Sequence, residues 1–432
     1  MFGKIRTIFL IWALTSLCLS QGALSFAGAA STSLSGQDVN LVQYVNPFTG
    51  TGNSPLPDYL GGNASGNTFP GAALPFGMIQ WSPDTENGFT KDARGSYIYD
   101  DTAIRGFSLT HISGPGCFIF ADVPFMPIVG RVGASTASGA YLAKFSHENE
   151  KASPGYYEVA LDSGVKVNLT VTTRTGFGIF TYPRTTEATM LVDVGRNATG
   201  VTDARIQIEG DKQISGSVTS GRFCGANNKY TIYFAAEFDR PFKAYGTWLD
   251  EKVTPGSRSG KGARTGGYVT FDTTANQAVR MKVGISYVSV RNALLNLRAE
   301  NPRWDFAEVR ERASARWNQV LRRIEVSGGT LAEKQVFYTA LYHTLLHPNV
   351  FNDVNGDYIG FDDRVHQTRG CTQYANFSGW DIYRSQIPLV ALLMPEEASD
   401  MMQSLVVDAE QGGGLPIWPV ANDESGAMVG DP

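Results

Sequence analysis

The sequence predicts a multidomain fold in which a β region is followed by a helical region. Two observations carry this prediction: apolar residues alternate with polar ones up to about Val290, and they recur every three or four residues after about Pro302. The first spacing gives a strand one apolar face, and the second gives a helix one apolar face. Strands without interleaved helices over roughly 250 residues are typical of a β-sandwich or a β-barrel.

The β region shows its alternation most clearly in residues 165–171 and 279–287, where apolar side chains occupy every second position. Turn-forming residues separate such runs, as in residues 153–155 (Ser-Pro-Gly) and 258–262 (Arg-Ser-Gly-Lys-Gly). We expect the β domain to occupy residues 30–290.

A helical linker is expected over residues 291–328. Within it, an amphipathic helix is predicted over about residues 303–324, with its apolar face at Phe306, Val309, Ala313, Trp317, Val320 and Ile324. After two glycines, Thr330 and Glu333 have the spacing of a capping box, which predicts the start of a helix that continues to about residue 347.

Two more helical segments follow. The run LVALLM at residues 389–394 is apolar enough for a buried helix. Pro395 opens another helix, with Glu396 and Glu397 in its first turn, where the helix dipole favours negative charge. Residues 412–414 (Gly-Gly-Gly) are expected to end it.

The N-terminus has the order of a secretory signal peptide. Lys4 and Arg6 precede an apolar run over residues 8–19, and small residues follow at 27–29. The run is too short to span a bilayer as a mature helix, and no later segment is apolar for long enough. We therefore expect a signal peptide at residues 1–29, no membrane span in the mature chain, and a secreted or periplasmic protein.

Composition narrows the class of partner. A net charge of −5 with 18% charged residues offers no basic surface and argues against binding to nucleic acid. The 47 glycines and 11% aromatic residues are compatible with a secreted β protein that binds sugars. Past the signal peptide the cysteines are Cys117, Cys224 and Cys371. Their wide spacing does not fit a zinc motif, and the pair expected to bond, if any does, is Cys117 with Cys224.

Four blocks of sequence resemble glycoside hydrolase family 92, the secreted exo-acting α-mannosidases. They are YVNPFTGT (44–51), GNTFPGAALPFGMIQWSPDT (66–85), GFSLTHISGPGC (106–117) and the long block that begins FSGWDIYRSQIP (377–432). The resemblance covers nearly the whole mature chain. It implies an N-terminal β-sandwich, a helical linker and an (α/α)₆ barrel, with the active site between sandwich and barrel and a calcium ion, Ca²⁺, that assists hydrolysis with inversion.

The resemblance also implies how much of the barrel this chain holds. Residues 329–432 contain fewer helical segments than a closed (α/α)₆ barrel needs, so we expect only its first part, an incomplete barrel. The family's general acid and general base come from later helices and are expected beyond Pro432. We therefore expect that this chain alone does not hydrolyse a glycoside.

The strongest candidates for substrate binding are Trp380, Asp381 and Arg384, which match the family's WD-x-x-R block at the barrel mouth. There Asp381 can accept hydrogen bonds from two adjacent sugar hydroxyls. Arg384 can donate to a hydroxyl or hold Asp381, and Trp380 offers an apolar wall. The residues alone also allow a plain ion pair at a helix end, and the two interpretations are compatible.

Other candidates are less specific. His111 and Cys117 are placed at the edge of the sugar pocket, although a lone histidine is more often a packed one. Asp423 is placed in the substrate site, as one of the carboxylates nearest the barrel mouth by sequence, which are Glu410, Asp423, Glu424 and Asp431; any of these is also compatible with a solvated loop charge. His343 and His347 are four residues apart on a helix, but Thr344 replaces the glutamate of a zinc-binding motif, so packing against the β domain is favoured.

The function implied is that of a calcium-dependent, inverting exo-α-mannosidase that releases terminal mannose from α-mannosides or N-glycans. In such a reaction one carboxylic acid protonates the leaving oxygen and a second carboxylate activates water, at a separation of about 6.5–9.5 Å. Calcium prefers oxygen ligands and would bind vicinal hydroxyls of mannose. The alternative is a non-catalytic, secreted carbohydrate-binding β-sandwich protein. The linkage preference stays open at this stage.

Overall fold

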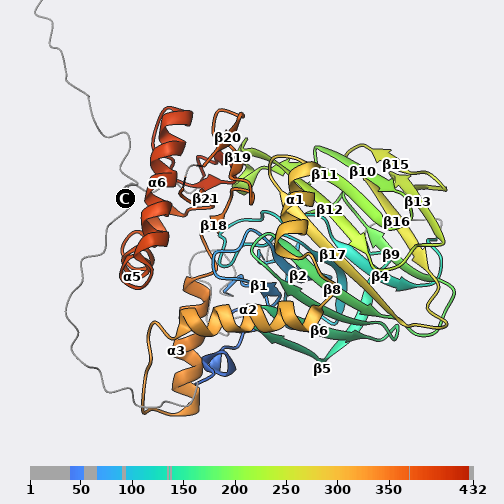
Figure 1. Ribbon diagram of the computed structural model, residues 1–432, viewed down its shortest axis with the longest axis horizontal. Helices are drawn as coiled ribbons and strands as arrows, with labels where there is room; N and C mark the ends of the chain where they lie inside the picture. The colour runs from blue at the N-terminus through green and yellow to red at the C-terminus, as the bar shows by residue number, and fades with distance from the viewer. Residues whose placement is uncertain are drawn as a thin grey trace, which may run out of the picture. The chain divides into compact units, whose positions relative to one another are not determined.

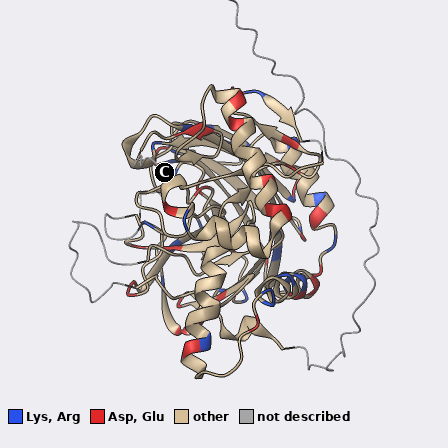
Figure 2. Ribbon diagram, turned by 90° about the vertical axis from the view of Figure 1, so that its left-hand side faces the viewer, with Lys and Arg blue, Asp and Glu red and all other residues tan. Residues whose placement is uncertain are grey.

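The computed structural model describes residues 39–52, 66–89, 94–133, 136, 139–368 and 370–427. The signal peptide predicted at residues 1–29 lies outside these ranges, as does Asp431. The prediction of a β region followed by helices is confirmed (Figure 1). Among the described helices, none combines the length and the apolar character that crossing a bilayer requires. Acidic and basic residues are interspersed along the helices and strands (Figure 2).

Among the described residues, the β region forms one continuous set of 17 antiparallel strands. Their bounds are β1 Ala72–Ala73, β2 Gln80–Thr85, β3 Ala103–Ser108, β4 Phe125–Val129, β5 Ala143–Ser153, β6 Tyr156–Leu161, β7 Lys166–Val171, β8 Thr175–Thr181, β9 Ala188–Val192, β10 Asp203–Glu209, β11 Gln213–Gly221, β12 Lys229–Phe238, β13 Ala244–Leu249, β14 Lys252–Pro255, β15 Ser259–Lys261, β16 Thr265–Phe271 and β17 Ala278–Ser286.

Two series of strands make up this set. One series runs β5-β6-β7-β8-β17-β12-β11-β10-β15, the other runs β1-β2-β3-β4-β9-β16-β13-β14, and β5 joins them by pairing with β3. Rings of the two series meet in the core: Trp81 of β2 lies 6.3 Å from Phe180 of β8, and Phe125 of β4 lies 6.2 Å from Phe234 of β12. Burying a large apolar side chain of this kind contributes roughly 1.5–3 kcal/mol.

The two alternating segments behave as predicted, because residues 165–171 and 279–287 contain β7 and β17 with their apolar side chains buried. The turn predicted at residues 258–262 is wrong in its centre. Ser259–Lys261 forms the short strand β15, which pairs with Arg205–Gln207 of β10. An available strand edge thus overrides the local turn preference of Ser and Gly.

The helical region contains α1 Val290–Glu300, α2 Phe306–Leu321, α3 Leu331–Thr344, α4 Gly379–Ile382, α5 Gln386–Leu393 and α6 Pro395–Gly412. The capping box of α3 is present as predicted, since Thr330 and Glu333 each accept from the other's backbone N–H. α6 begins at Pro395 and ends in the glycine run as predicted, with its last residue at Gly412 and its C-cap at Gly413, whose φ of +85° suits glycine.

Two features of the helical region were not predicted. The linker is two helices rather than one, because α1 precedes the expected amphipathic helix. Three small two-stranded sheets also interrupt the helices: β18 (Asn349–Val350) pairs with β21 (Tyr374–Ala375), β19 (Asp357–Ile359) with β20 (Val365–Gln367), and β22 (Pro419–Val420) with β23 (Asp423–Glu424). The LVALLM run is only partly buried, with Leu393 inside and Leu392 78% exposed in α5.

Polar contacts fix the helices onto the strands. The indole of Trp317 in α2 donates to the carbonyl oxygen of Ala73 at 2.7 Å. Arg174 forms an ion pair with Glu300 at the end of α1, at 2.7 Å. Asp353, just after β18, accepts from Asn296 of α1 at 2.6 Å. These bonds define how the helical segments face the loops of the β region.

Candidate active site

The β region supplies one wall of a pocket through the irregular segment 112–116, which follows β3. His111 anchors the start of this wall and is only 1% exposed. Its Nδ1 donates to the carbonyl oxygen of Gln80 at 2.9 Å, and its Nε2 lies 3.0 Å from Oδ1 of Asp84. The wall therefore begins at a buried, fully bonded imidazole.

The helical region supplies the opposite wall. Its pocket-lining side chains include Asn376, Ser378, Asp381 and Gln386, with His347 and Trp418 beside them. The cavity between these residues and segment 112–116 measures about 400 Å³, which is within the usual range for a small-molecule site. We call this cavity the Asp381 pocket.

His347 joins the two walls. Its Nε2 accepts a hydrogen bond from the backbone N–H of Ser113 at 2.9 Å, and its Nδ1 lies 2.7 Å from Oδ1 of Asn349. An N–H can only donate, so Nε2 carries no proton and the ring is the neutral Nδ1–H form. Burial agrees with this, because it lowers the pKa of His347 to about 4.

Of Trp380, Asp381 and Arg384, the three fixed residues of the WD-x-x-R block, Asp381 alone is in the described lining of the Asp381 pocket. Asp381 lies in the single turn α4 and accepts from the hydroxyl of Ser378. The guanidinium of Arg384 donates to the hydroxyl of Tyr383 and lies over its ring. Within the described part of the chain, no ion pair joins Asp381 to Arg384, so the helix-end ion pair allowed by the sequence is not formed. The carboxylate of Asp381 is left exposed at the pocket.

A disulfide fastens the far end of the β wall. Cys117 and Cys224 are bonded, with their Cα atoms 5.2 Å apart, which confirms the pairing expected from the sequence; Cys371 lies outside this disulfide. Next to Cys224, the ring of Phe223 stacks on Trp418 at 4.4 Å. The disulfide therefore also connects the β wall to an aromatic side chain of the opposite wall.

The remaining candidates lie at or beyond the edge of the Asp381 pocket. His111 and Cys117 flank segment 112–116 without lining the cavity, and Trp380 and Arg384 also lie outside its lining. Asp423 lies in β23, where its Oδ2 accepts from the backbone N–H of Lys229 at 2.9 Å. It lines a separate, open pocket beside Cys224. The roles given to these residues stay predictions.

Of the predicted substrate residues, Asp381 alone lines the Asp381 pocket, and the lining residues that were not predicted include His347, Gln386 and Trp418. His347 was expected to pack against the β domain, and its bond to Ser113 confirms that contact. The signal for Trp418 lay in its block, GGGLPIWPVAND, which follows α6 directly. Gln386 donates to the carbonyl oxygens of Thr344 and His347. These contacts join residues about forty positions apart, so no local sequence pattern predicts them.

A calcium site is not built from carboxylates in the described residues. Among these residues, no group of three His, Cys, Asp or Glu side chains is placed to hold a metal ion. Ca²⁺ also takes backbone and amide carbonyl oxygens and water as ligands, and we assign no calcium ligand among the described residues.

Comparison with known proteins identifies both halves of this arrangement. Residues 44–286 match the model of the glycosyl hydrolase family 92 N-terminal domain, and residues 292–432 match that of the family 92 catalytic domain. In Arthroderma benhamiae, a protein described as an uncharacterized secreted glycosidase is 24% identical over 351 residues, which cover 73% of this chain and 43% of that protein.

Solved structures agree. The GH92 α-mannosidase BT3965 of Bacteroides thetaiotaomicron is 31% identical with a TM-score of 0.83, over 91% of this chain and 53% of that one. The GH92 inverting mannosidase BT2199 of the same organism is 28% identical with a TM-score of 0.80, over 92% and 52%. The chain thus spans about half the length of these relatives. Since family models match most of its length, on both sides of the Asp381 pocket, the chain belongs to glycosyl hydrolase family 92.

Proposed function

We propose that this chain forms the β-sandwich, the helical linker and the first part of the (α/α)₆ barrel of a calcium-dependent, inverting exo-α-mannosidase. The proposed substrates are α-mannosides or N-glycans from which terminal mannose is released. The observation that carries the proposal is the Asp381 pocket, where a β-region loop and a helical-region carboxylate line one cavity. A structure of BT3965 in complex with mannoimidazole, at 31% identity to this chain, supports a mannose-like ligand.

Within the pocket, we give Asp381 the role of holding the sugar. Its carboxylate is exposed at the pocket and receives one described side-chain hydrogen bond, from Ser378. A carboxylate has room for about four hydrogen bonds, so it can also accept from two adjacent sugar hydroxyls. The neutral His347 holds segment 112–116 opposite Asp381, and Trp418 closes the cavity beside it.

The general acid and the general base are assigned to no described residue. Inversion requires two carboxyl groups about 6.5–9.5 Å apart on either side of the scissile bond, and within the described lining Asp381 is the only carboxylate of the pocket. We therefore propose that residues 39–427 bind the terminal sugar without supplying the proton transfers. Calcium dependence belongs to this proposal through the family resemblance alone, and we derive no step from it.

The proposed location is outside the cytoplasm, secreted or periplasmic. Its support is the signal-like order of residues 1–29 and the description of the Arthroderma benhamiae relative as secreted.

One titration tests the function. We would add α-mannobiose to the ¹⁵N-labelled mature chain in the presence of Ca²⁺, follow the indole N–H resonance of Trp418, and assay free mannose in the same tube. We expect the Trp418 resonance to shift on binding and Asp381→Asn to weaken this binding about tenfold or more, since a charged hydrogen-bond acceptor is lost.

Other outcomes decide against the proposal or part of it. If the Trp418 resonance does not shift during the titration, the sugar does not bind in the Asp381 pocket. Shifts confined to the β region, without turnover, would favour a plain carbohydrate-binding protein. Release of mannose by the mature chain would confirm the mannosidase but overturn the absence of an acid and a base.

A further inference from the structure

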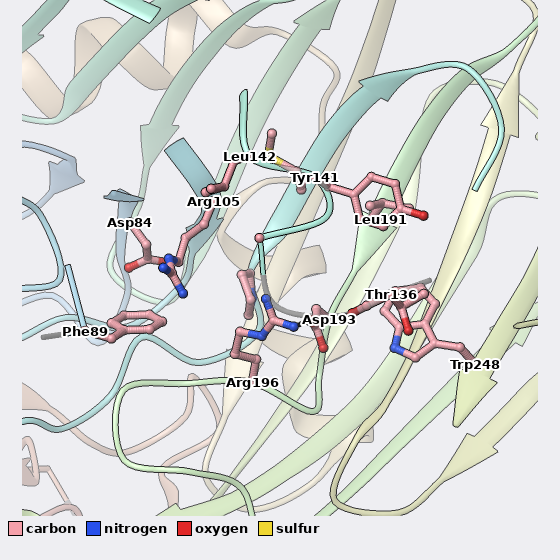
Figure 3. Close-up of a pocket in the computed structure, with 13 residues that line it drawn as sticks. Asp84, Phe89, Arg105, Thr136, Tyr141, Leu142, Leu191, Asp193, Arg196 and Trp248 are labelled. Atoms are coloured by element: carbon pink, nitrogen blue, oxygen red, sulfur yellow. Dashed lines mark hydrogen bonds and ion pairs between the residues drawn. The ribbon is translucent and has the colours of Figure 1, made fainter. Parts of the chain in front are cut away.

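A second cavity lies within the β region and shares no described lining residue with the Asp381 pocket. Figure 3 shows its side chains, which come mainly from β2, β3, β4, β9 and β13, from Thr136 and residues 139–142 before β5, and from the segment after β9. The inner cavity measures about 40 Å³. It has four described lining residues in common with an outer pocket of about 550 Å³, so the two adjoin. We call them together the paired-arginine pocket, defined by Asp84, Arg105, Asp193, Arg196 and Trp248.

Hydrogen bonds use only some of the N–H groups of the two guanidinium groups, and the guanidinium of Arg105 also lies over the ring of Phe89 at 4.9 Å. Arg105 donates through Nε to the carbonyl oxygen of Thr85 at 3.0 Å and through Nη2 to that of Glu86. Nη2 of Arg196 lies 3.4 Å from Oδ2 of Asp193 and donates to the carbonyl oxygen of Thr136 at 3.5 Å. In the described part of the chain, Nη1 of Arg105 and both Nε and Nη1 of Arg196 have no hydrogen-bond acceptor. These N–H groups are donors available to a ligand.

The two carboxylates are also only partly used. Oδ1 of Asp84 contacts His111, whereas its Oδ2 is buried and has no hydrogen-bond partner among the described residues. The side chain of Asp84 is 1% exposed and that of Asp193 is 23% exposed. Burial raises the pKa of both carboxyl groups. A buried polar atom without a partner costs about 1–3 kcal/mol, so such a group is normally satisfied by a ligand or by water.

The two arginines face a shared space. Burial lowers the pKa of Arg105; the charge of Asp84 opposes this, and the positive charge of Arg196 lowers it further. Repulsion between the guanidinium groups is balanced because one carboxylate accompanies each of them. The charges of Asp84, Arg105, Asp193 and Arg196 sum to zero, and Asp250, Glu251 and Arg264 of the outer part add one net negative charge. The lining therefore has no net attraction for an anion, and its closely mixed charges suit a neutral polar ligand.

A sugar residue has the chemistry that these walls can bind. Its hydroxyls donate to carboxylates and accept from guanidinium groups, and its C–H faces pack on rings. Trp248 lines both parts of the pocket, and Tyr141 lines the inner part. The outer volume is in the range of ligand sites in general. Convergent polar groups beside aromatic rings are typical of a binding site rather than of a packed core.

We propose that the paired-arginine pocket is a second binding site for a neutral sugar unit, separate from the Asp381 pocket. The buried pair Asp84–His111 lies between the two sites, because Asp84 lines one and His111 directly precedes the wall of the other. A glycan with several mannose units would then be held at two places on one chain. This site binds and does not hydrolyse, so it does not depend on the proposed function.

Each pocket contains one tryptophan, which makes the test specific. We would titrate the ¹⁵N-labelled mature chain with methyl α-D-mannopyranoside and follow the indole resonances of Trp248 and Trp418, each assigned from its Trp→Phe variant. We expect Arg196→Met to weaken binding seen at Trp248 by about tenfold or more and to leave binding at Trp418 unchanged. Asp381→Asn is expected to have the opposite pattern.

Arg131→Met is the matched control, because Arg131 is an exposed, ion-paired arginine that lines neither pocket. Circular dichroism checks folding, and Arg196→Lys replaces Arg196→Met if the latter does not fold; lysine keeps the charge but loses the planar fork. A Trp248 resonance that does not move, or that moves equally in Arg196→Met and Arg131→Met, overturns the second site. So does a shift caused by inorganic phosphate but not by the mannoside. Absence of binding at Trp418, with binding at Trp248 retained, contradicts the proposed function but not the second site.

Discussion

The backbone N–H of Ser113 donates a hydrogen bond to Nε2 of His347 at 2.9 Å, across 234 residues of sequence. This one bond links the loop after β3 to the segment after α3, so it sets the distance between the two walls of the Asp381 pocket. It requires an unprotonated Nε2, and the pKa of His347, lowered to about 4 by burial, keeps the ring neutral at pH 7.

We expect His347→Phe to lower the free energy of unfolding at pH 7 by about 1–3 kcal/mol, because it leaves the Ser113 N–H and Asn349 without their partner. The effect depends on pH. The folded pKa lies below the ordinary value of 6.5, so the unfolded chain takes up the proton first as the pH falls. The contribution of the neutral ring is therefore complete above pH 6.5 and is lost towards pH 4.

The measurement is urea unfolding of the wild type and the variant between pH 7 and pH 4. The stability difference between them is expected to shrink as the pH falls. His366→Phe serves as control, since His366 is a partly exposed residue that bonds Asp362. A difference that stays constant over this range would contradict a neutral His347 in the folded protein.

Reduction of the Cys117–Cys224 disulfide is expected to destabilise the β wall. The bond closes a loop of 107 residues, and removing such a constraint typically costs about 2–4 kcal/mol. We expect a reductant to lower the melting temperature of the wild type and to speed hydrogen exchange in segment 112–116. The double variant Cys117→Ser/Cys224→Ser should melt lower from the start and show no response to the reductant. If the reductant lowers the melting temperature of both proteins equally, the effect does not come from the Cys117–Cys224 disulfide.

Much of the fold could be predicted from the sequence because the signals were local. The capping box at Thr330 and the glycine after α6 mark helix ends through contacts within one turn. α1 was not predicted, because its buried face includes Asn292 and Asn296. These side chains donate hydrogen bonds to Asp353, so the helix lacks a regular apolar face in the sequence. β15 was not predicted, because it forms only by pairing with β10, which lies some fifty residues earlier in the sequence. Turn preferences consider only neighbouring residues and do not include such a partner.

The part of the candidate site that could be predicted also has a local sequence signal. Asp381 stands in a dense local block and does line a pocket. His347 and Trp418 gain their positions from residues far away in the sequence, Ser113 and Phe223, so no periodicity or spacing shows them. Pairings of this kind become visible only once the chain is folded.

Asp408 provides a second pH-dependent test, in α6. It accepts from Nε2 of Gln373 at 3.0 Å, and burial raises its pKa to about 8. Here the folded pKa lies above the unfolded value of 3.8, so the folded chain keeps the proton that the unfolded chain has lost. The wild type is therefore expected to lose stability as the pH rises from about 4 to 8, by at most about 1.4 kcal/mol per pH unit from this group.

Asp408→Asn keeps a neutral acceptor for Gln373 and removes the titration. We expect its stability relative to the wild type to increase with pH up to about 8 and then to level off. Unfolding curves at several pH values measure this, with the exposed Glu410→Gln in the same helix as control. A flat difference between pH 4 and pH 8 would mean that Asp408 is ionised in the folded chain.

Metal removal tests the calcium part of the proposed function. In any preparation of this protein that releases mannose, we expect a calcium chelator to abolish release and added Ca²⁺ to restore it. Zinc is expected to substitute poorly, because it prefers nitrogen and sulfur ligands in a tetrahedral shell. Full activity in excess chelator would contradict the calcium-assisted mechanism. It would not test the sugar-binding role of Asp381.

The last prediction concerns how Asp381 acts. It lines the pocket but is assigned no proton transfer, so in a preparation that releases mannose we expect Asp381→Asn to raise KM or to lower kcat strongly while the pH profile of kcat keeps its shape. The amide retains one acceptor oxygen and the Ser378 contact, whereas Asp381→Ala loses both and is expected to bind still more weakly. Asp272→Asn is the matched control, since Asp272 is an exposed aspartate of the β region that lines neither pocket. Kinetics of Asp381→Asn equal to those of the wild type in a folded protein would remove Asp381 from the site. A lost limb of the pH profile would instead point to Asp381 as the acid or the base, because the limbs of the kcat profile report the pKa values of the essential acid and base in the enzyme–substrate complex.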